Sequence, residues 1–459
     1  MTPSSISTIT EPARQVDVVA HFDVLVIGSG PGGLAAALAA ARAGARVGLV
    51  ERFGFFGGNI TAVGVEGLAW YRHEATVEAG GILVELEAAA AAAGAAVPEG
   101  QSLSMELDAE GFKAVADELV VEAGITPMLH RTFAAPIVEA GRVRGVVVES
   151  KAGREALLAE VTIDATGDAD VAHRAGAVTR TTPVEDMMAA SVIFHLAGVD
   201  RRRFLDGVAA DPQTYADWSG GGEWVVETDG KEDEMFSPFL NKPFKAAIAD
   251  GLLPPELVTI GGTWGAVHDS GELTYLNLVH LDGIDGTDPD ALTRGEIEGR
   301  RQVRQVVEAI RRYVPGCEES RLRNLGSTLG VRDTRKIVSA HDLTEADVRN
   351  QGRFADSIGI FPEFIDGYGI LILPTTGRYF EVPFRSITPI GVGGLLVAGR
   401  SSGGDRVAHA ATRNMACCVV TGQGAGVAAA LAVRLGVDPT TVPIDEIHDE
   451  LRRQDVRLH

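Results

Sequence analysis

Three glycines near the N-terminus have the spacing of a phosphate-binding turn. The stretch Asp23 to Gly33 reads DVLVIGSGPGG, in which an apolar run ends in a G-x-G-x-x-G pattern made by Gly28, Gly30 and Gly33. An apolar run with this turn and an alanine-rich continuation is typical of a buried parallel strand leading into a helix. Gly28 permits the tight turn, Gly30 lets the backbone approach a pyrophosphate, and Gly33 allows close packing of helix and strand. The positive end of the helix dipole would attract the anion.

An acidic residue makes this pattern more specific. Residues 46 to 50 predict a second strand, which ends at Glu51, 23 residues after Gly28. A carboxylate at that point can accept a hydrogen bond from a ribose 2′-hydroxyl and would repel a 2′-phosphate. The order of strand, turn, helix, strand and acid therefore predicts a dinucleotide site. The pair Gly57 and Gly58 soon afterwards indicates backbone that approaches something bulky, with a simple turn as the alternative.

Several charged residues could do chemistry beyond the cofactor. Asp168 and Asp170 follow a predicted strand and could be an acid–base pair, but the favoured explanation is that one or both cap a helix or lie just behind the residues that touch the cofactor. Arg332 and Arg335 would share a face if they lay on a helix, where a solvated face or an ion pair is the alternative. Arg385 precedes the last apolar strand and could anchor a substrate carboxylate through a bidentate pair, or it could bridge two domains.

Composition excludes several classes of function. The chain has 459 residues, 45% of them hydrophobic, and a net charge of −22, so a polyanion would be repelled and no nucleic acid partner is expected. Three cysteines give no disulfide or iron–sulfur pattern, and the histidines lack H-x-x-x-H spacing, so we expect no metal and a reducing, cytoplasmic location. Residues 417–436 are apolar enough to mimic a membrane span, but their Gly and Ala content favours a buried helix, so no membrane is expected. A homo-oligomer stays possible.

The glycines in Gly422-Gln-Gly-Ala-Gly426 are a different case from the first motif. They lie inside a predicted helix and not after a strand, so they indicate close helix packing and not a second phosphate loop. No other glycine cluster follows a strand and precedes a helix with an acid beyond it, so we expect no separate NAD(P)H domain.

The order of these motifs resembles a known family. The resemblance rests on four stretches of the chain. Two of them hold motifs that are more specific than the first glycine motif: Gly-Val-Arg-Asp-Thr-Arg, and Val-Pro-Phe-Arg-Ser followed by Leu-Val-Ala-Gly-Arg. The chain resembles the FAD-dependent oxidoreductases of the glutathione-reductase-like flavoprotein class, in the branch related to fumarate-reductase-type flavoproteins. The resemblance implies FAD and redox chemistry, and it implies no substrate. The stretches are residues 28–61, 163–170, 329–347 and 379–430.

The fold that follows is α/β, a discontinuous Rossmann-like FAD-binding domain plus a mixed α+β substrate or cap domain. The FAD-binding domain should have a parallel sheet with an inserted β meander. The expected division is a flexible tail at 1–20, an FAD-binding domain at 21–66, 107–181 and 390–459, a helical insertion at 67–106 and a substrate or cap domain at 182–389.

The resemblance also implies roles for single residues. The pyrophosphate would lie at the first three glycines, the adenosine ribose at Glu51 with Arg52 nearby, and the adenine at backbone near Ala134. The helix that starts near Met415 would point its N-terminus at the flavin pyrimidine ring, where negative charge appears on reduction. His409 would face the ring and accept a proton while hydride goes to the flavin; the alternative for His409 is a structural role. His73 and His280 are weaker candidates for the same base. The remaining cofactor residues would be Gly57, Gly58 and Asn59 along the ribityl and flavin side, Thr166 and Gly167 at the phosphate turn, and Gly399 and Arg400 at the ribityl chain.

These observations predict an FAD-dependent oxidoreductase that transfers a hydride between a small organic substrate and the flavin. Two alternatives stay open. One is a flavin-carrying electron-transfer subunit of a larger complex, and the other is an NAD-using, thiazole-synthase-like Rossmann enzyme. The electron acceptor is left open.

Overall fold

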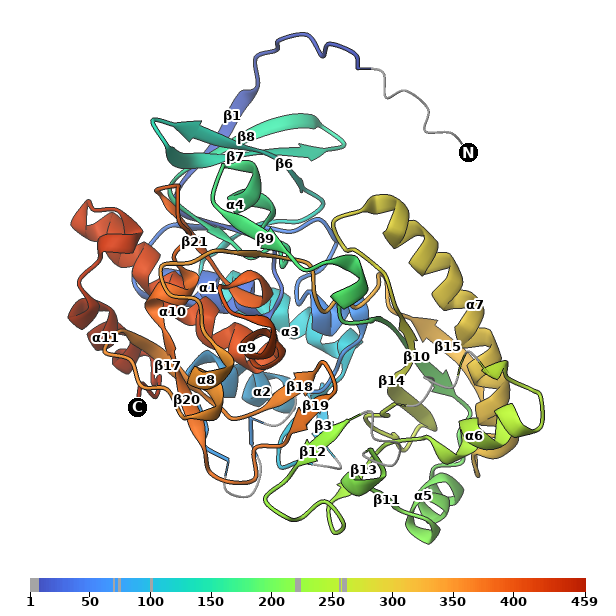
Figure 1. The fold of residues 1–459 in the computed structure, drawn as a ribbon. Coiled ribbons are helices and arrows are strands. Elements are labelled where there is room, and N and C mark those ends of the chain that lie inside the picture. The colour runs from blue at the N-terminus through green and yellow to red at the C-terminus, as the bar shows by residue number, and fades with distance from the viewer. Residues whose placement is uncertain are drawn as a thin grey trace.

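The structure is a computed structural model that describes residues 8–68, 71–72, 76–99, 102–218, 224–255, 257 and 262–459. Figure 1 shows two parts joined along one side. The FAD-binding part, blue, cyan and red in the figure, surrounds the long helix α10 (Met415–Leu435), and the cap, green and yellow, carries α7 (Pro289–Tyr313). His73 lies outside the described residues.

The FAD-binding part is built on a parallel sheet. β1 (Asp17–Ile27) pairs in parallel with β2 (Val47–Val50) and β8 (Gly153–Asp164), β2 pairs with β5 (Thr126–Met128), and β21 (Leu395–Val397) pairs with β8. The apolar runs predicted as strands are buried on both faces, as parallel strands between layers must be. This confirms the Rossmann-like α/β fold.

The β meander is inserted as expected. β6 (Thr132–Glu139) pairs antiparallel with β7 (Arg142–Ser150), and β7 pairs antiparallel with the first half of β8. The second half of β8 then enters the parallel sheet between β1 and β21. One strand therefore leads from the meander to the edge where Thr166 and Gly167 lie.

Two helices pack closely on this sheet. α1 (Pro31–Arg42) lies against α10, and a Cβ added to Gly422 or Gly426 would come within 2.1 Å of the carbonyl oxygen of Gly32 or 2.2 Å of that of Ala36. The glycines of α10 therefore serve helix packing, as predicted. Among the described residues α10 is the one helix long and apolar enough to cross a membrane, and 94% of its most apolar window is buried in the protein.

The segment 67–106 is less helical than expected. Its described residues hold α2 (Ile82–Ala92) and a hairpin of β3 (Ala96–Pro98) and β4 (Met105–Leu107). The alanine-rich composition correctly indicated α2, but the run of helix stops at Gly94, whose φ of +70° closes the turn. α3 (Ala109–Glu122) follows, capped by Asp108.

The cap has its own core around an antiparallel sheet. β10 (Ala190–Ala197) lies between β14 (Glu272–Leu281) and β15 (Arg321–Leu325), and α7 covers the sheet. Alternate residues Val192, Phe194 and Leu196 of β10 face that core. Ser191, Ile193 and His195 therefore lie on the other face.

The cap ends earlier than residue 389. Its core stops at Leu329, whereas buried residues from Leu343 to Ile387 join the core of the FAD-binding part. β17 (Ser357–Pro362), paired with β20 (Tyr379–Pro383), packs against α10. Short strands of this kind carry no sign of which core they join, so the sequence placed the boundary too late.

The other elements are short and complete the two parts. They are α4 (Asp170–Arg174), β9 (Thr179–Thr181), α5 (Arg201–Ala210), β11 (Gln213–Thr214), β12 (Val225–Glu227), β13 (Phe236–Ser237), α6 (Lys242–Ala249), β16 (Arg335–Ile337), α8 (Glu345–Arg349), β18 (Ile365–Gly367), β19 (Ile370–Ile372), α9 (Arg406–Thr412) and α11 (Ile444–Arg453).

Candidate cofactor and substrate site

The phosphate turn has the geometry its glycines require. Gly28 has a φ of +98°, its N–H donates to the Val50 carbonyl at 2.8 Å, and an added Cβ would lie 2.4 Å from the Ala165 carbonyl oxygen. A Cβ on Gly33 would lie 1.9 Å from the Gly28 oxygen. A Cβ on Gly30 would meet nothing within 4 Å. Two glycines are thus packed against backbone, while Gly30 borders open space at the N-terminus of α1, where a pyrophosphate fits.

Glu51 lies at the end of β2 and is held from two sides. Its Oε2 accepts hydrogen bonds from the backbone N–H of Ser29 at 3.0 Å and from the Ser29 hydroxyl at 2.6 Å, and its Oε1 accepts from the N–H of Phe53 at 3.0 Å. A carboxylate has about four acceptor positions, so one is left for a ribose hydroxyl. Arg52 beside it is exposed and covers the Phe53 ring.

The second glycine pair packs against the phosphate turn. The N–H of Gly57 donates to the Ser29 carbonyl at 3.0 Å, and a Cβ on Gly58, whose φ is +51°, would lie 2.4 Å from Cα of Gly30. Asn59 then begins η1, a helical turn over Asn59–Val63, and its Nδ2 lies 3.4 Å from Sδ of Met415. The predicted cofactor residues from opposite ends of the chain therefore meet at the N-terminus of α10.

Gly399 and Arg400 complete this side. A Cβ on Gly32 would lie 3.2 Å from Gly399, and the N–H of Gly399 donates to Oγ1 of Thr421 at 2.9 Å. Arg400 forms an ion pair with Asp168 at 2.8 Å, and its guanidinium lies against Gly167. Thr166 donates through its hydroxyl to Asp164 at 2.7 Å.

Ala134 lies at an irregularity of the meander. The pairing of β6 with β7 shifts register between Phe133 and Ala135, which makes Ala134 the extra residue of a bulge. The chain just before β6 runs beside the ribose position, because the N–H of Arg131 donates to the Glu51 carbonyl at 3.0 Å. The backbone of Ala134 is thus placed near the adenosine side, and its contact with adenine stays a prediction.

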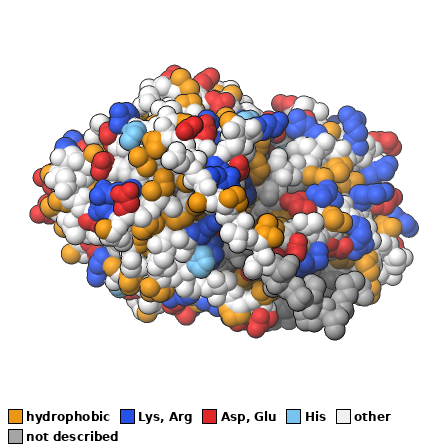
Figure 2. All heavy atoms as spheres, turned by 90° about the horizontal axis from the view of Figure 1, so that it is seen from above, with side chains coloured by type: hydrophobic (Ala, Val, Ile, Leu, Met, Phe, Trp, Pro, Cys, Tyr) orange, Lys and Arg blue, Asp and Glu red, His pale blue; other side chains and the backbone are white. Residues whose placement is uncertain are grey.

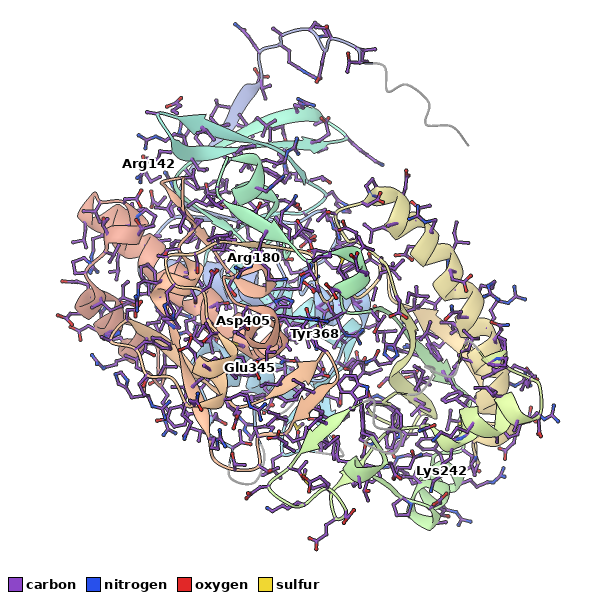
Figure 3. The ribbon with its side chains drawn as sticks, in the orientation of Figure 1. Arg142, Arg180, Lys242, Glu345, Tyr368 and Asp405 are labelled. Atoms are coloured by element: carbon purple, nitrogen blue, oxygen red, sulfur yellow. The ribbon has the colours of Figure 1, made fainter. Side chains whose placement is uncertain are left out.

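His409 is buried on α9. Asp405 caps this helix through the N–H of Ala408 at 2.9 Å and also accepts from the N–H of Glu345 at 2.7 Å, which joins α9 to α8 (Figure 3). Nε2 of His409 donates to the Arg332 carbonyl at 3.0 Å, so its proton is on that nitrogen, and Nδ1 has no hydrogen-bond partner in the described part of the chain. Burial holds the pKa of His409 well below its usual value, so the ring is neutral. Its role as a base stays a prediction.

The carboxylates and arginines weighed from the sequence form ion pairs. Asp168 is bound by Arg400, and Asp170 by Arg335 at 2.7 Å. Arg335 lies in β16 and not on a helix, so the shared helical face with Arg332 is wrong. The reason is that residues 335–337 pair with β9.

Arg385 is half-exposed and is bound by Asp356. Its guanidinium makes two hydrogen bonds to that carboxylate, at 2.9 and 3.1 Å. Both residues lie in the FAD-binding part, so this ion pair does not bridge the two domains, and a substrate role for Arg385 stays a prediction without a contact to the residues of the cofactor turn.

The sequence reasoning missed a row of polar side chains on the cap. Arg332 donates to the Ala189 carbonyl at 2.5 Å and to Oδ1 of Asn277 at 3.4 Å, and Ser191 donates to the same Oδ1 at 2.8 Å. A Cβ on Gly330 would lie 2.9 Å from the Val63 side chain at the end of η1, so this row adjoins the flavin side of the phosphate turn. Ser191 and His195 in an otherwise apolar strand were the available signal.

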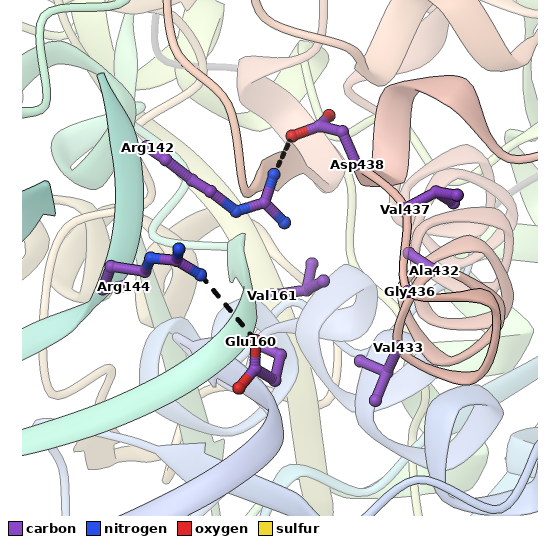
Figure 4. Close-up of a pocket in the computed structure, with 9 residues that line it drawn as sticks. All are labelled: Arg142, Arg144, Glu160, Val161, Ala432, Val433, Gly436, Val437 and Asp438. Atoms are coloured by element: carbon purple, nitrogen blue, oxygen red, sulfur yellow. Dashed lines mark hydrogen bonds and ion pairs between the residues drawn. The ribbon is translucent and has the colours of Figure 1, made fainter. Parts of the chain in front are cut away.

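A pocket away from this site lies at the other end of α10. Its cavity of about 380 Å³ is bordered by Arg142, Glu160 and the C-terminal end of α10 (Figure 4). Arg142 forms an ion pair there with Asp438. At 1.5 Å per residue, this end of α10 is roughly 25 Å from Met415, so the pocket is separate from the cofactor turn.

The fold and the site define a Rossmann-type flavoprotein. A model of the family described as FAD dependent oxidoreductase matches residues 23–451, and the chain belongs to that family. It is an FAD-dependent enzyme. The open flank of Gly30, the remaining acceptor position of Glu51 and the N-terminus of α10 fit FAD, and the family match answers the choice between FAD and NAD.

The relatives of this chain include reductases. The chain is 29% identical over 393 residues to digeranylgeranylglycerophospholipid reductase 1 of Methanopyrus kandleri, covering 76% of this chain and 98% of the relative. It is 33% identical over 180 residues to the corresponding enzyme of Methanoculleus marisnigri, a match that spans 44% of that relative and 37% of this chain. A geranylgeranyl bacteriochlorophyll reductase-like protein of Thermoplasma acidophilum superimposes with a TM-score of 0.46 at 14% identity, over 96% of this chain and 85% of that one.

Proposed function

We propose that the enzyme transfers a hydride between FAD and a small polar organic substrate whose anionic group is held by Arg332. Bound FAD supplies the hydride donor or acceptor. The residues of the chain bind the cofactor, hold the substrate and move the proton that accompanies the hydride.

The observation that carries this proposal is the state of Arg332. Its hydrogen bonds go to a carbonyl and an amide, and no carboxylate among the described residues forms an ion pair with it. Desolvation and the nearby Arg413 cation lower the pKa of Arg332 to about 10, and the charge of Asp366, which is paired with Arg413, does not offset them, so Arg332 lacks a counter-ion in direct contact. An anionic substrate would provide that counter-ion through a charge-assisted hydrogen bond.

The neighbours of Arg332 support a site at this point. Arg413, buried beside it, forms an ion pair with Asp366 at 2.9 Å and leaves its Nε without a partner in the described part of the chain. His409 is held against the Arg332 carbonyl, and Arg400 donates to the carbonyl of Val331. The segment 330–333 thus lies between the cap sheet and the N-terminus of α10.

The relatives' names suggest a lipid substrate, but the lining favours a smaller one. Ser191, Asn277 and Arg332 are polar or charged, and a prenyl chain would cover the Arg332 cation without giving it a counter-ion. A cytoplasmic location is also part of the proposal, supported by three free, buried cysteines. Figure 2 shows acidic and basic side chains interspersed over one face, so that face presents no single-sign field to a polyanion.

An anaerobic screen tests this proposal. The oxidised holoenzyme is mixed with hydroxy acids and amino acids, the dithionite-reduced holoenzyme with α,β-unsaturated acids, and each acid is paired with its uncharged amide or ester. We expect at least one acid to bleach or restore the flavin band while its uncharged counterpart does so far more slowly. Equal rates for acids and uncharged counterparts would contradict the proposal.

A further inference from the structure

Buried acidic groups lie where the cap sheet meets the segment after η1. Glu66 follows that segment, and Glu106 lies in β4, where it forms a bridge with Gly67. His195 of β10 and Tyr275 of β14 approach from the cap. Glu66 and Glu106 are each 1% exposed and His195 is 3% exposed, so the group is enclosed between the two parts of the molecule.

Neither carboxyl oxygen of Glu106 has a hydrogen-bond partner among the residues that the structure describes. Both atoms are fully buried. A Cβ on Gly67 would lie 3.3 Å from Oε1 of Glu106 and 3.4 Å from Cε1 of Tyr275, so the carboxyl lies beside the edge of that ring. An ionised carboxylate in this position would be unpaired and desolvated, so burial raises the pKa of Glu106 well above its usual value and the group is a neutral acid.

Glu66 and His195 form the second half of the group. Nε2 of His195 lies 3.9 Å from Oε1 of Glu66 and has no hydrogen-bond partner in the part of the chain described, and that Oε1 accepts from the N–H of Ala109 at 3.1 Å. Burial raises the pKa of Glu66 to about 7 and lowers that of His195 to about 4. The imidazole is therefore neutral at pH 7, and the exchangeable protons are on the carboxyl groups.

This group is connected to the flavin side through the backbone. The N–H of Val65, next to Glu66, donates to the carbonyl of Asn59 at 3.2 Å, and Asn59 contacts Met415 at the N-terminus of α10. A negative charge that appears on a reduced flavin there would raise the proton affinity of nearby carboxyl groups.

The group is also connected to Arg332 along the cap sheet. Tyr275 and Asn277 are two residues apart in β14, and Asn277 binds both Ser191 and Arg332. Tyr275 has a φ of +49°, a conformation that an aromatic residue in a strand adopts only under constraint from its surroundings, and such residues cluster at functional sites. Tyr275 thus stands between the acids and the proposed substrate anchor.

We propose that Glu66, Glu106 and His195 form a proton store for the flavin reaction, and that Tyr275 passes the proton between this store and the substrate. The inference rests on the proposed function. When a substrate receives a hydride, the Tyr275 hydroxyl gives a proton to the substrate atom that gains the electron pair, and the carboxyl of Glu106 replaces it. In the oxidative direction the proton returns by the same groups, so no further reactant is required.

Other charged groups also face the store and contribute to the electrostatic potential at its carboxyl groups. They are Asp108 and Glu110 at the start of α3, Arg323 of β15, His268 before β14, and Glu99. None of them is changed by the substitutions below, so the differences between variants report on the store.

The test measures the midpoint potential of the FAD-loaded protein against pH from 6 to 9, from which the number of protons taken up per two electrons follows. It needs no substrate, so its failure is distinguishable from failure of the screen above. We expect the wild type to take up a fraction of a proton more than Glu66→Gln near pH 7 and more than Glu106→Gln toward the alkaline end of the range, and the exposed control Glu185→Gln to match the wild type. Equal proton numbers in wild type and both store variants would overturn the proposal.

Two further measurements keep the test decisive if a glutamine variant fails to bind FAD. The wild type at pH 7 should show an infrared carboxylic-acid C=O band that shifts in D₂O, and absence of this band would overturn the proposal. After flash photoreduction, Tyr275→Phe should take up the same number of protons as the wild type but several-fold more slowly. An unchanged rate of proton uptake would show that Tyr275 is not on the route. Tyr313→Phe, at the surface, is the matched control.

Discussion

Ser29 and Glu51 lie 22 residues apart in the chain and meet through two hydrogen bonds, one from the Ser29 backbone and one from its hydroxyl, both to the same carboxylate oxygen. This contact ties the phosphate turn to the end of β2, so the pyrophosphate and ribose positions are fixed relative to each other. A side chain that binds the cofactor also shapes the turn beside it.

Glu51→Ala should therefore weaken FAD retention. The substitution removes the ribose acceptor and leaves Ser29 without its partner, and loss of a charged hydrogen bond costs about 1.5–3 kcal/mol, or roughly 10- to 100-fold in affinity. Flavin content after dialysis, followed by titration of the apoprotein with FAD, measures it. His409→Ala is the comparison and should lose much less FAD; equal losses in both variants would contradict the assigned roles.

Gly30→Ala and Gly33→Ala should separate binding from folding. The new methyl group of Gly30→Ala enters the open space meant for the pyrophosphate, so the protein should fold with an unchanged melting temperature and lose FAD. In Gly33→Ala the Cβ would approach the Gly28 oxygen to 1.9 Å, which should destabilise the fold by about 3 kcal/mol. Thermal denaturation of the apoproteins measures the difference in stability between the two variants. Similar melting temperatures would argue against distinct roles for Gly30 in pyrophosphate binding and Gly33 in packing.

Arg385→Ala should affect stability slightly and activity hardly at all. The ion pair with Asp356 is half-exposed, so its removal should cost no more than about 1 kcal/mol. Urea denaturation and the rate of flavin reduction by any substrate from the screen are the two measurements. A large loss of rate with unchanged stability would instead support a substrate-anchoring role for Arg385.

The buried acid Glu66 should make stability depend on pH. Its folded pKa of about 7 lies above the value of about 4.5 expected in the unfolded chain. The folded state therefore holds the proton more tightly, so the contribution of Glu66 is fully present below pH 4.5 and is lost as the pH rises through 7. The total change is about 3 kcal/mol.

The measurement is the difference in unfolding free energy between Glu66→Gln and the wild type across this range. The difference should shift in favour of the glutamine variant as the pH rises from 4.5 to 7.5. Parallel stability curves would show that Glu66 titrates normally.

The sequence was most informative where backbone conformation and spacing carry the function. The turn at Gly28, the acid at Glu51 and the glycines of α10 were predictable because each answers a local steric or electrostatic demand. Arg332 was noted only as one of two spaced arginines, because its missing counter-ion depends on how segments 190–197, 272–281 and 330–333 meet. Tyr275 and Glu106 were not predicted, since an unpaired buried carboxyl is invisible without the tertiary contacts around it.

The central claim is that Arg332 holds an anionic substrate beside the flavin, and ligand titration of the oxidised holoenzyme tests it most directly. Small carboxylates and their matched amides are titrated while the flavin absorbance band is followed, in the wild type and in Arg332→Gln, with the surface variant Arg353→Gln as control. We expect carboxylates to perturb the band in the wild type and control, with binding weakened about 100-fold in Arg332→Gln and for the amides. Equal affinities of wild type and Arg332→Gln for the carboxylates would contradict the account.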